Sequence, residues 1–129
     1  MAQLNLGGFG YNEFITKTGN YTVVNADSGT VINVTATATV TLPATGVGNV
    51  GLGPIIRVGA EGITLTIAPA AADNILGAQL TATVNKALIF TSAPLGSYVQ
   101  LSSNGITTGA WSIVRLDACG ATATVTKAP

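Results

Sequence analysis

The sequence predicts an all-β fold, namely a single-domain antiparallel β-sandwich or jelly roll of about ten short strands with a flexible N-terminal arm. Three observations lead to this prediction. β-branched residues dominate short runs, turn-forming residues separate these runs roughly every 8–12 residues, and apolar residues rarely recur at helical spacing. A chain of 129 residues is long enough for one hydrophobic core and too short for two independent ones.

The expected strands lie on either side of a glycine-rich loop at residues 46–54. Before the loop, strands are expected at residues 21–24, 30–34 and 38–42. After it, they are expected at residues 55–58, 63–67, 80–84, 87–91, 98–102, 111–116 and 122–125. The run at 63–67 alternates strictly, so Ile63, Leu65 and Ile67 should face the core and the two threonines between them should face outward.

The chain divides into an N-terminal arm at residues 1–19 and a β-sandwich domain at residues 20–129. Glycines interrupt the only aromatic-rich stretch of the arm, which contains Phe9, Tyr11 and Phe14. A segment of this kind can become ordered against a partner, so these three aromatics are the candidate contact residues. The alternative is a poorly ordered terminus whose aromatic side chains fold onto the domain.

The low charge of the chain excludes several classes of partner. Charged residues are 8% of the sequence, with five Lys and Arg against five Asp and Glu, so we expect no binding to nucleic acid or to an anionic membrane surface. No apolar run approaches the roughly 20 residues that span a bilayer, and no signal-peptide pattern opens the chain. Synthesis in the cytoplasm is expected. A nearly neutral, threonine-rich surface also favours permanent assembly, because net charge keeps soluble proteins apart.

The residues that enzymes use are scarce. The chain has no histidine and one cysteine, which excludes imidazole-based catalysis and zinc binding by soft ligands. The five carboxylates, Glu13, Asp27, Glu61, Asp73 and Asp117, lie in or near expected turns. Glycoside hydrolysis needs only two carboxyl groups and stays open as a minor alternative. We therefore expect a non-enzymatic protein with no catalytic residue, metal, cofactor or small-molecule substrate.

Several other residues have structural interpretations. Trp111 lies on an expected strand and is interpreted as a core anchor, whereas Tyr98 fits either the core or an interface. Asp27 and Asp73 are expected to satisfy backbone groups of turns. Cys119 cannot form an intramolecular disulfide and is expected to be a small buried apolar residue.

Five short motifs together resemble a known structural module. They are DSGTVI at residues 27–32, VTLP at 40–43, ITLTI at 63–67, DNILG at 73–77 and WSIV at 111–114. In this order they resemble the β-rich module of tailed-phage structural proteins, which is found in head decoration (cement) proteins and in parts of tail fibres. The resemblance covers about residues 20–116 and brings no catalytic residues with it.

The resemblance implies a role and a location. A decoration protein forms a homotrimer on the outer surface of the capsid and bridges neighbouring subunits of the major capsid protein, which would make Phe9, Tyr11 and Phe14 candidate capsid or intersubunit contacts. Its location would be the virion, after synthesis in the host cytoplasm. The alternative that the resemblance leaves open is a tail-associated module, such as a fibre tip or baseplate component, that contacts a host receptor.

Overall fold

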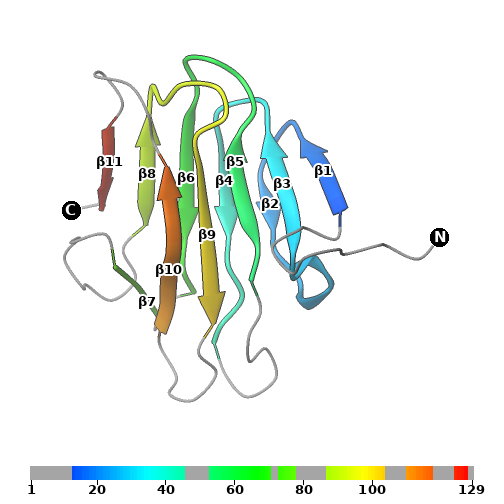
Figure 1. The fold of residues 1–129 in the computed structure, drawn as a ribbon, viewed down its shortest axis with the longest axis vertical. Coiled ribbons are helices and arrows are strands. Elements are labelled where there is room, and N and C mark those ends of the chain that lie inside the picture. Colours follow the sequence, from blue (N-terminus) through cyan, green and yellow to red (C-terminus); the bar gives the residue numbers. More distant parts are fainter. Residues whose placement is uncertain are drawn as a thin grey trace.

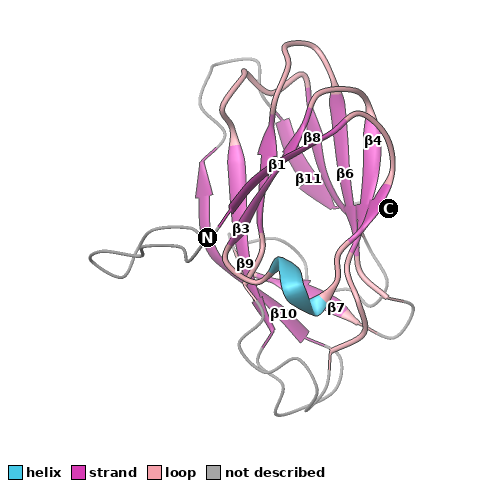
Figure 2. Cartoon of the chain, turned by 90° about the vertical axis from the view of Figure 1, so that its right-hand side faces the viewer, coloured by secondary structure: helices cyan, strands magenta, loops and turns pink. Residues whose placement is uncertain are grey.

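The computed structural model describes residues 13–45, 53–70, 73–77, 87–103, 110–117 and 124–127. Within these residues the predicted all-β fold is confirmed, as two β-sheets that face each other (Figures 1 and 2). The six-stranded sheet, called sheet A, has the spatial order β1 (Glu13–Lys17), β3 (Thr30–Val34), β5 (Ile55–Val58), β9 (Tyr98–Ser103), β10 (Ala110–Asp117) and β7 (Asn74–Leu76). The five-stranded sheet, sheet B, has the order β11 (Thr124–Lys127), β8 (Leu88–Thr91), β6 (Thr64–Ala68), β4 (Ala38–Thr41) and β2 (Tyr21–Thr22).

The chain alternates between the two sheets from β1 to β9. Each of the first four strands therefore pairs with the strand two places later, and these pairs are parallel: β1 with β3, β2 with β4, β3 with β5 and β4 with β6. A parallel pair needs a connection that returns to the starting end, and a strand of the opposite sheet provides it. Strands β8 to β11 add antiparallel pairs. The two sheets are thus mixed, and not antiparallel as predicted.

Most strands lie where the sequence predicts them. Those at 30–34 and 55–58 match the expected bounds, and β4, β6, β8, β9 and β10 differ by one residue at one or both ends. The expected strand at 80–84 lies outside the described residues. Two short edge strands were not predicted, β1 and β7. β1 lies within the region predicted as the N-terminal arm. Residues 13–17 of that region therefore form a strand of sheet A, where Ile15 packs against the core.

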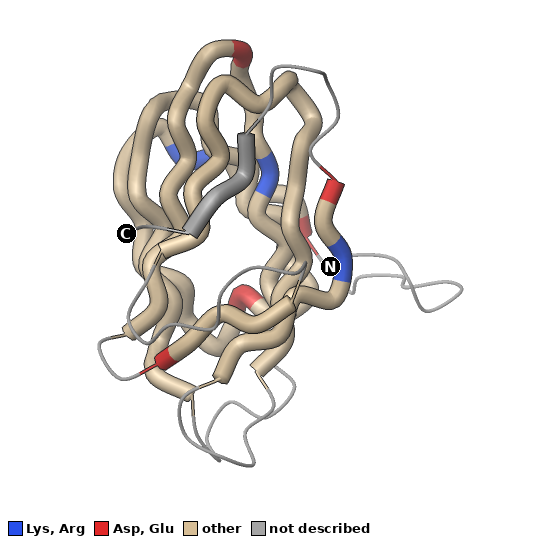
Figure 3. The backbone as a smooth tube through the Cα atoms, turned by 90° about the vertical axis from the view of Figure 1, so that its left-hand side faces the viewer, with Lys and Arg blue, Asp and Glu red and all other residues tan. Residues whose placement is uncertain are grey.

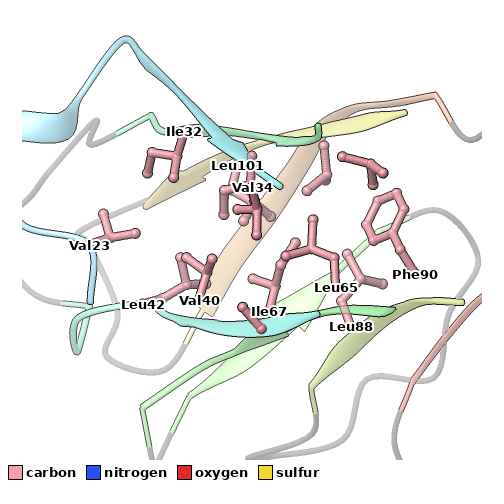
Figure 4. Close-up of a cluster of buried hydrophobic side chains, with 14 of the residues drawn as sticks. Val23, Ile32, Val34, Val40, Leu42, Leu65, Ile67, Leu88, Phe90 and Leu101 are labelled. Atoms are coloured by element: carbon pink, nitrogen blue, oxygen red, sulfur yellow. The ribbon is translucent and has the colours of Figure 1, made fainter. Parts of the chain in front are cut away.

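The core fills the space between the two sheets. Figure 4 shows Ile32 and Leu101 of sheet A pointing toward side chains of sheet B that include Val40 and Ile67. The predicted alternation of residues 63–67 is confirmed, because the three aliphatic side chains are buried and the threonines between them are partly exposed. Trp111 is fully buried, as predicted, and its indole Nε1 donates a hydrogen bond to the carbonyl oxygen of Pro43 at 3.2 Å.

The link between β2 and β3 is held by one buried carboxylate. The segment consists of a short 3₁₀ turn, η1 (Asn25–Asp27), followed by Gly29 at a φ of 75°. Asp27 Oδ2 accepts hydrogen bonds from the Tyr21 hydroxyl at 2.7 Å and from the Val24 backbone N–H at 2.9 Å. This confirms that Asp27 satisfies a backbone group of the turn.

The same contact predicts a pH dependence of stability. The pKa of Tyr21 is raised to about 12, first by burial, then by the hydrogen bond to Asp27, and then by the negative charges of Asp27 and Glu13. Because an unfolded tyrosine has a pKa of about 10, the stability that depends on this phenol is fully present below about pH 10 and is lost as the pH rises through about 12. The Tyr21→Phe variant is expected to be less stable at neutral pH and to lose less stability over this alkaline range, as measured by urea denaturation. An equal alkaline loss in both proteins would contradict the assignment.

Candidate binding faces of the sandwich

The outer face of sheet B is covered with threonines. Because Val40, Leu65 and Ile67 point into the core, the residues that alternate with them point outward. The residues of this face, called the threonine face, are Thr22, Thr39, Thr41, Thr64, Thr66 and Thr91, with Ala68 and Ile89 completing it. In the strand register, Thr22 lies opposite Thr41, Thr39 opposite Thr66, and Thr64 opposite Thr91.

The threonine face is uncharged and regular. All of its side chains are partly or fully exposed, and none is ionisable. Figure 3 shows that charged residues are few and scattered along the described backbone. Neighbouring strands lie about 4.8 Å apart, and alternate residues of one strand about 6.8 Å apart, so the hydroxyls form a spaced array. Such a face can be covered by another protein without burying a charge.

The outer face of sheet A carries a groove with a volume of about 300 Å³. This groove, called the arginine groove, is lined by Phe14, Val31, Ile55, Arg57, Gly96, Tyr98, Gln100 and Arg115. Its residues come from β1, β3, β5, β9, β10 and the turn before β9. It therefore crosses five neighbouring strands of one sheet, two of which supply an arginine.

Arg57 is held in place from several sides. Its Nη1 donates a hydrogen bond to Asn33 Oδ1, and Asn33 Nδ2 donates in turn to Thr16 Oγ1 at 3.4 Å. The guanidinium carbon lies 5.8 Å from the centre of the Phe14 ring, within the range of a cation–π interaction. Asn33 is buried although it lies on the outer side of sheet A. The guanidinium is thus oriented before any ligand arrives.

Arg115 reaches the groove because of an irregularity in β10. Ile113 lies opposite Leu101 and Arg115 lies opposite Gln100, so Val114 is an extra residue in the ladder. A β-bulge of this kind reverses which face the following side chains occupy. Without it, Arg115 would share the inward face with Trp111 and Ile113. Val114 itself is 57% exposed.

The predicted contact residues are only partly described. Phe14 lies in the arginine groove and is 47% exposed, whereas Phe9 and Tyr11 lie outside the described residues. Tyr98, for which core and interface were both open, lines the groove and is partly exposed. Arg57 and Arg115 could not be identified from the sequence, because nothing in a single strand indicates which distant strands will lie beside it.

Three carboxylates bind backbone groups. Besides Asp27, Asp73 Oδ2 accepts a hydrogen bond from the Thr45 N–H at 2.9 Å. Glu61 Oε1 accepts one from the Leu95 N–H at 3.2 Å. Asp73 was expected to satisfy backbone groups of a turn, and its bond to the Thr45 N–H joins two segments that are 28 residues apart in the chain. These contacts give the three side chains structural roles.

Gly59 provides the space that Asn33 occupies. A Cβ atom at position 59 would lie 2.6 Å from Asn33 Oδ1, so in the Gly59→Ala variant Asn33 must shift and its bond to Arg57 is disturbed. We expect a loss of about 1–3 kcal/mol in the free energy of unfolding, measured by urea denaturation. Gly19→Ala is the matched control, because its Cβ would meet nothing within 4 Å. Equal stabilities of the two variants would contradict this role of Gly59.

The described residues contain no group of three or more His, Cys, Asp or Glu side chains that could hold a metal ion. In the same part of the chain, no helix has the length and apolar character needed to cross a membrane. Searches of protein-family models, curated proteins and solved structures found no match to this chain.

Proposed function

We propose that the chain is a structural protein of a tailed-phage particle, a decoration protein that forms a homotrimer on the outer surface of the head. In this role it bridges neighbouring subunits of the major capsid protein and acts without catalysis or cofactor. The threonine face is the main structural observation that supports this proposal. The resemblance of residues 20–116 to the phage module adds the identity of the particle.

The threonine face suits an interface between copies of the chain. A rigid sheet loses little conformational freedom when it is covered, and threonine hydroxyls can form intersubunit hydrogen bonds with a small desolvation cost. The side chains of Thr39, Thr41, Thr64 and Thr66 are all partly exposed on this face. Three such faces packed around a common axis would form a trimer.

This arrangement leaves sheet A on the outside of the trimer. The arginine groove would then be repeated three times around the axis and could contact several neighbouring subunits of a shell. Three linked contacts raise the overall affinity well above that of each contact alone. A modest interaction at each groove is therefore sufficient for stable attachment.

The second candidate function is a tail-associated module, at a fibre tip or baseplate, that contacts a host receptor. The arginine groove is the observation that favours it, because receptor binders expose aromatic and charged side chains and the groove offers Phe14, Tyr98 and two arginines. The apolar residues in its floor and its position across five strands of one sheet favour a protein surface of the shell instead.

Locating the protein on particles separates the two functions. Particles would be prepared without the protein, mixed with the labelled full chain, and examined by electron microscopy. The decoration role predicts that the label is distributed over the heads. It also predicts that an excess of unlabelled protein removes this label by competition. Label confined to tails would overturn the decoration role and support the receptor-contacting module.

A further inference from the structure

The arginine groove combines a guanidinium that is held in one orientation, that of Arg57, with an apolar floor. We propose that it binds an acidic side chain flanked by apolar residues, presented on an extended segment of the shell protein. The naming of the shell protein as the partner rests on the proposed function. The chemistry of the segment rests on the groove alone.

The positive charge of the groove is available to a ligand. The hydrogen-bond partner of Arg57 Nη1 is Asn33, a neutral side chain, so this contact orients the guanidinium without neutralising it. The other terminal nitrogen, Nη2, lies on the side of Gly96, where a Cβ atom would come no closer than 3.9 Å. Arg115 is exposed at the other side of the groove. Two guanidiniums in one groove favour a carboxylate, to which each can donate two parallel hydrogen bonds.

The remaining walls favour a peptide over a free acid. Phe14, Val31 and Ile55 lie side by side in the register of β1, β3 and β5, and together they offer an apolar floor to a neighbouring aliphatic side chain. Tyr98 and Gln100 supply a hydroxyl and an amide that can bond to a peptide backbone. A volume of about 300 Å³ lies at the small end of ligand sites, which fits a few side chains of a segment.

An acidic sugar is the competing ligand of similar charge. Its ring carries several hydroxyls that need hydrogen-bond partners once they are desolvated. Where a sugar ring would need such partners, the floor of the groove offers three apolar side chains, and the groove has few neutral polar groups. The apolar floor therefore favours the peptide.

The test uses the isolated full chain and three defined probes at low ionic strength. The probes are the blocked tripeptide acetyl-Leu-Glu-Leu-amide, the same peptide with Gln in place of Glu, and N-acetylneuraminic acid. Binding is followed by the amide shifts of the ¹⁵N-labelled protein and by calorimetry. We expect the Glu peptide to shift the amides of Arg57, Tyr98 and Arg115, and to bind at least about 10-fold more tightly than the Gln peptide.

Variants of the groove test whether the two arginines cause the preference for the Glu peptide over the Gln peptide. Arg57→Gln and Arg115→Gln should each reduce the Glu-over-Gln preference severalfold. Lys17→Gln removes a cation that lies over the Tyr21 ring, outside the groove, and should leave the preference unchanged. Folding of each variant is checked by its amide spectrum.

Four results would overturn the proposal: no shifts in the groove at tens of millimolar peptide, equal binding of the Glu and Gln peptides, tighter binding of the sugar acid, or loss of self-association in Arg115→Gln. The last result would assign the groove to a second copy of the chain. Because these experiments need no particle, they can succeed even if the protein proves to lie on tails, and can fail even if it lies on heads.

Discussion

Replacing Thr66 with lysine is expected to disrupt the proposed trimer. Thr66 lies in the middle of the threonine face, opposite Thr39 on one side and Ile89 on the other. In the proposed trimer, three lysine ammonium groups would be brought together near one axis and removed from water. Burial of unpaired charge costs several kcal/mol, so we expect self-association to weaken by about 100-fold or more.

Sedimentation equilibrium of the purified variant measures this effect. The folded state is checked by urea denaturation, because the substitution lies on the solvent side of a strand in the isolated chain. Thr18→Lys is the matched control: it introduces the same charge at an exposed position outside the threonine face and should leave the trimer intact. A Thr66→Lys protein that still sediments as the wild-type assembly would place the subunit interface elsewhere.

The Trp111→Ala variant is expected to lose about 3–5 kcal/mol in the free energy of unfolding. Trp111 is among the largest fully buried side chains, and it also donates a hydrogen bond to the Pro43 carbonyl, which joins two segments 68 residues apart. The substitution leaves a cavity between the sheets and removes the donor. Since small domains are stable by only about 5–15 kcal/mol, this one change would remove a large share of the total.

Urea denaturation of two further variants separates packing from hydrogen bonding. Trp111→Phe keeps an aromatic ring and loses the indole N–H, so a smaller loss of about 1–3 kcal/mol is expected. Val114→Ala, on the same strand but 57% exposed, should change stability by no more than about 0.5 kcal/mol. A loss below about 1 kcal/mol for Trp111→Ala would contradict the position of this residue in the core.

The strands could be predicted from the sequence, but their pairing could not. Runs of β-branched and apolar residues next to turn residues identified residues 30–34 and 55–58, and alternation of apolar and polar residues identified residues 63–67. Neither signal depends on strand direction. Consecutive strands usually pair with each other, whereas here each early strand crosses to the opposite sheet. The parallel pairing of strands β1 to β6 therefore cannot be recognised from the local sequence pattern.

The two binding faces were predictable to different degrees. The alternation at 63–67 placed Thr64 and Thr66 on an outer face. Their alignment with Thr39 required the parallel register of β4 and β6. The arginine groove was not predictable, because Phe14, Arg57 and Arg115 are far apart in the chain and Arg115 faces outward only through a bulge. Two of its residues were singled out in advance: Phe14 as an aromatic of the arm, and Tyr98 as a residue of either the core or an interface.

Sedimentation of the purified full chain, alone and mixed with particles that lack it, tests the central claim most directly. The decoration role predicts a species of three times the 12.8 kDa chain mass that also sediments with the particles. A protein that stays monomeric at every concentration and remains in the supernatant after the particles are pelleted would contradict the proposed function.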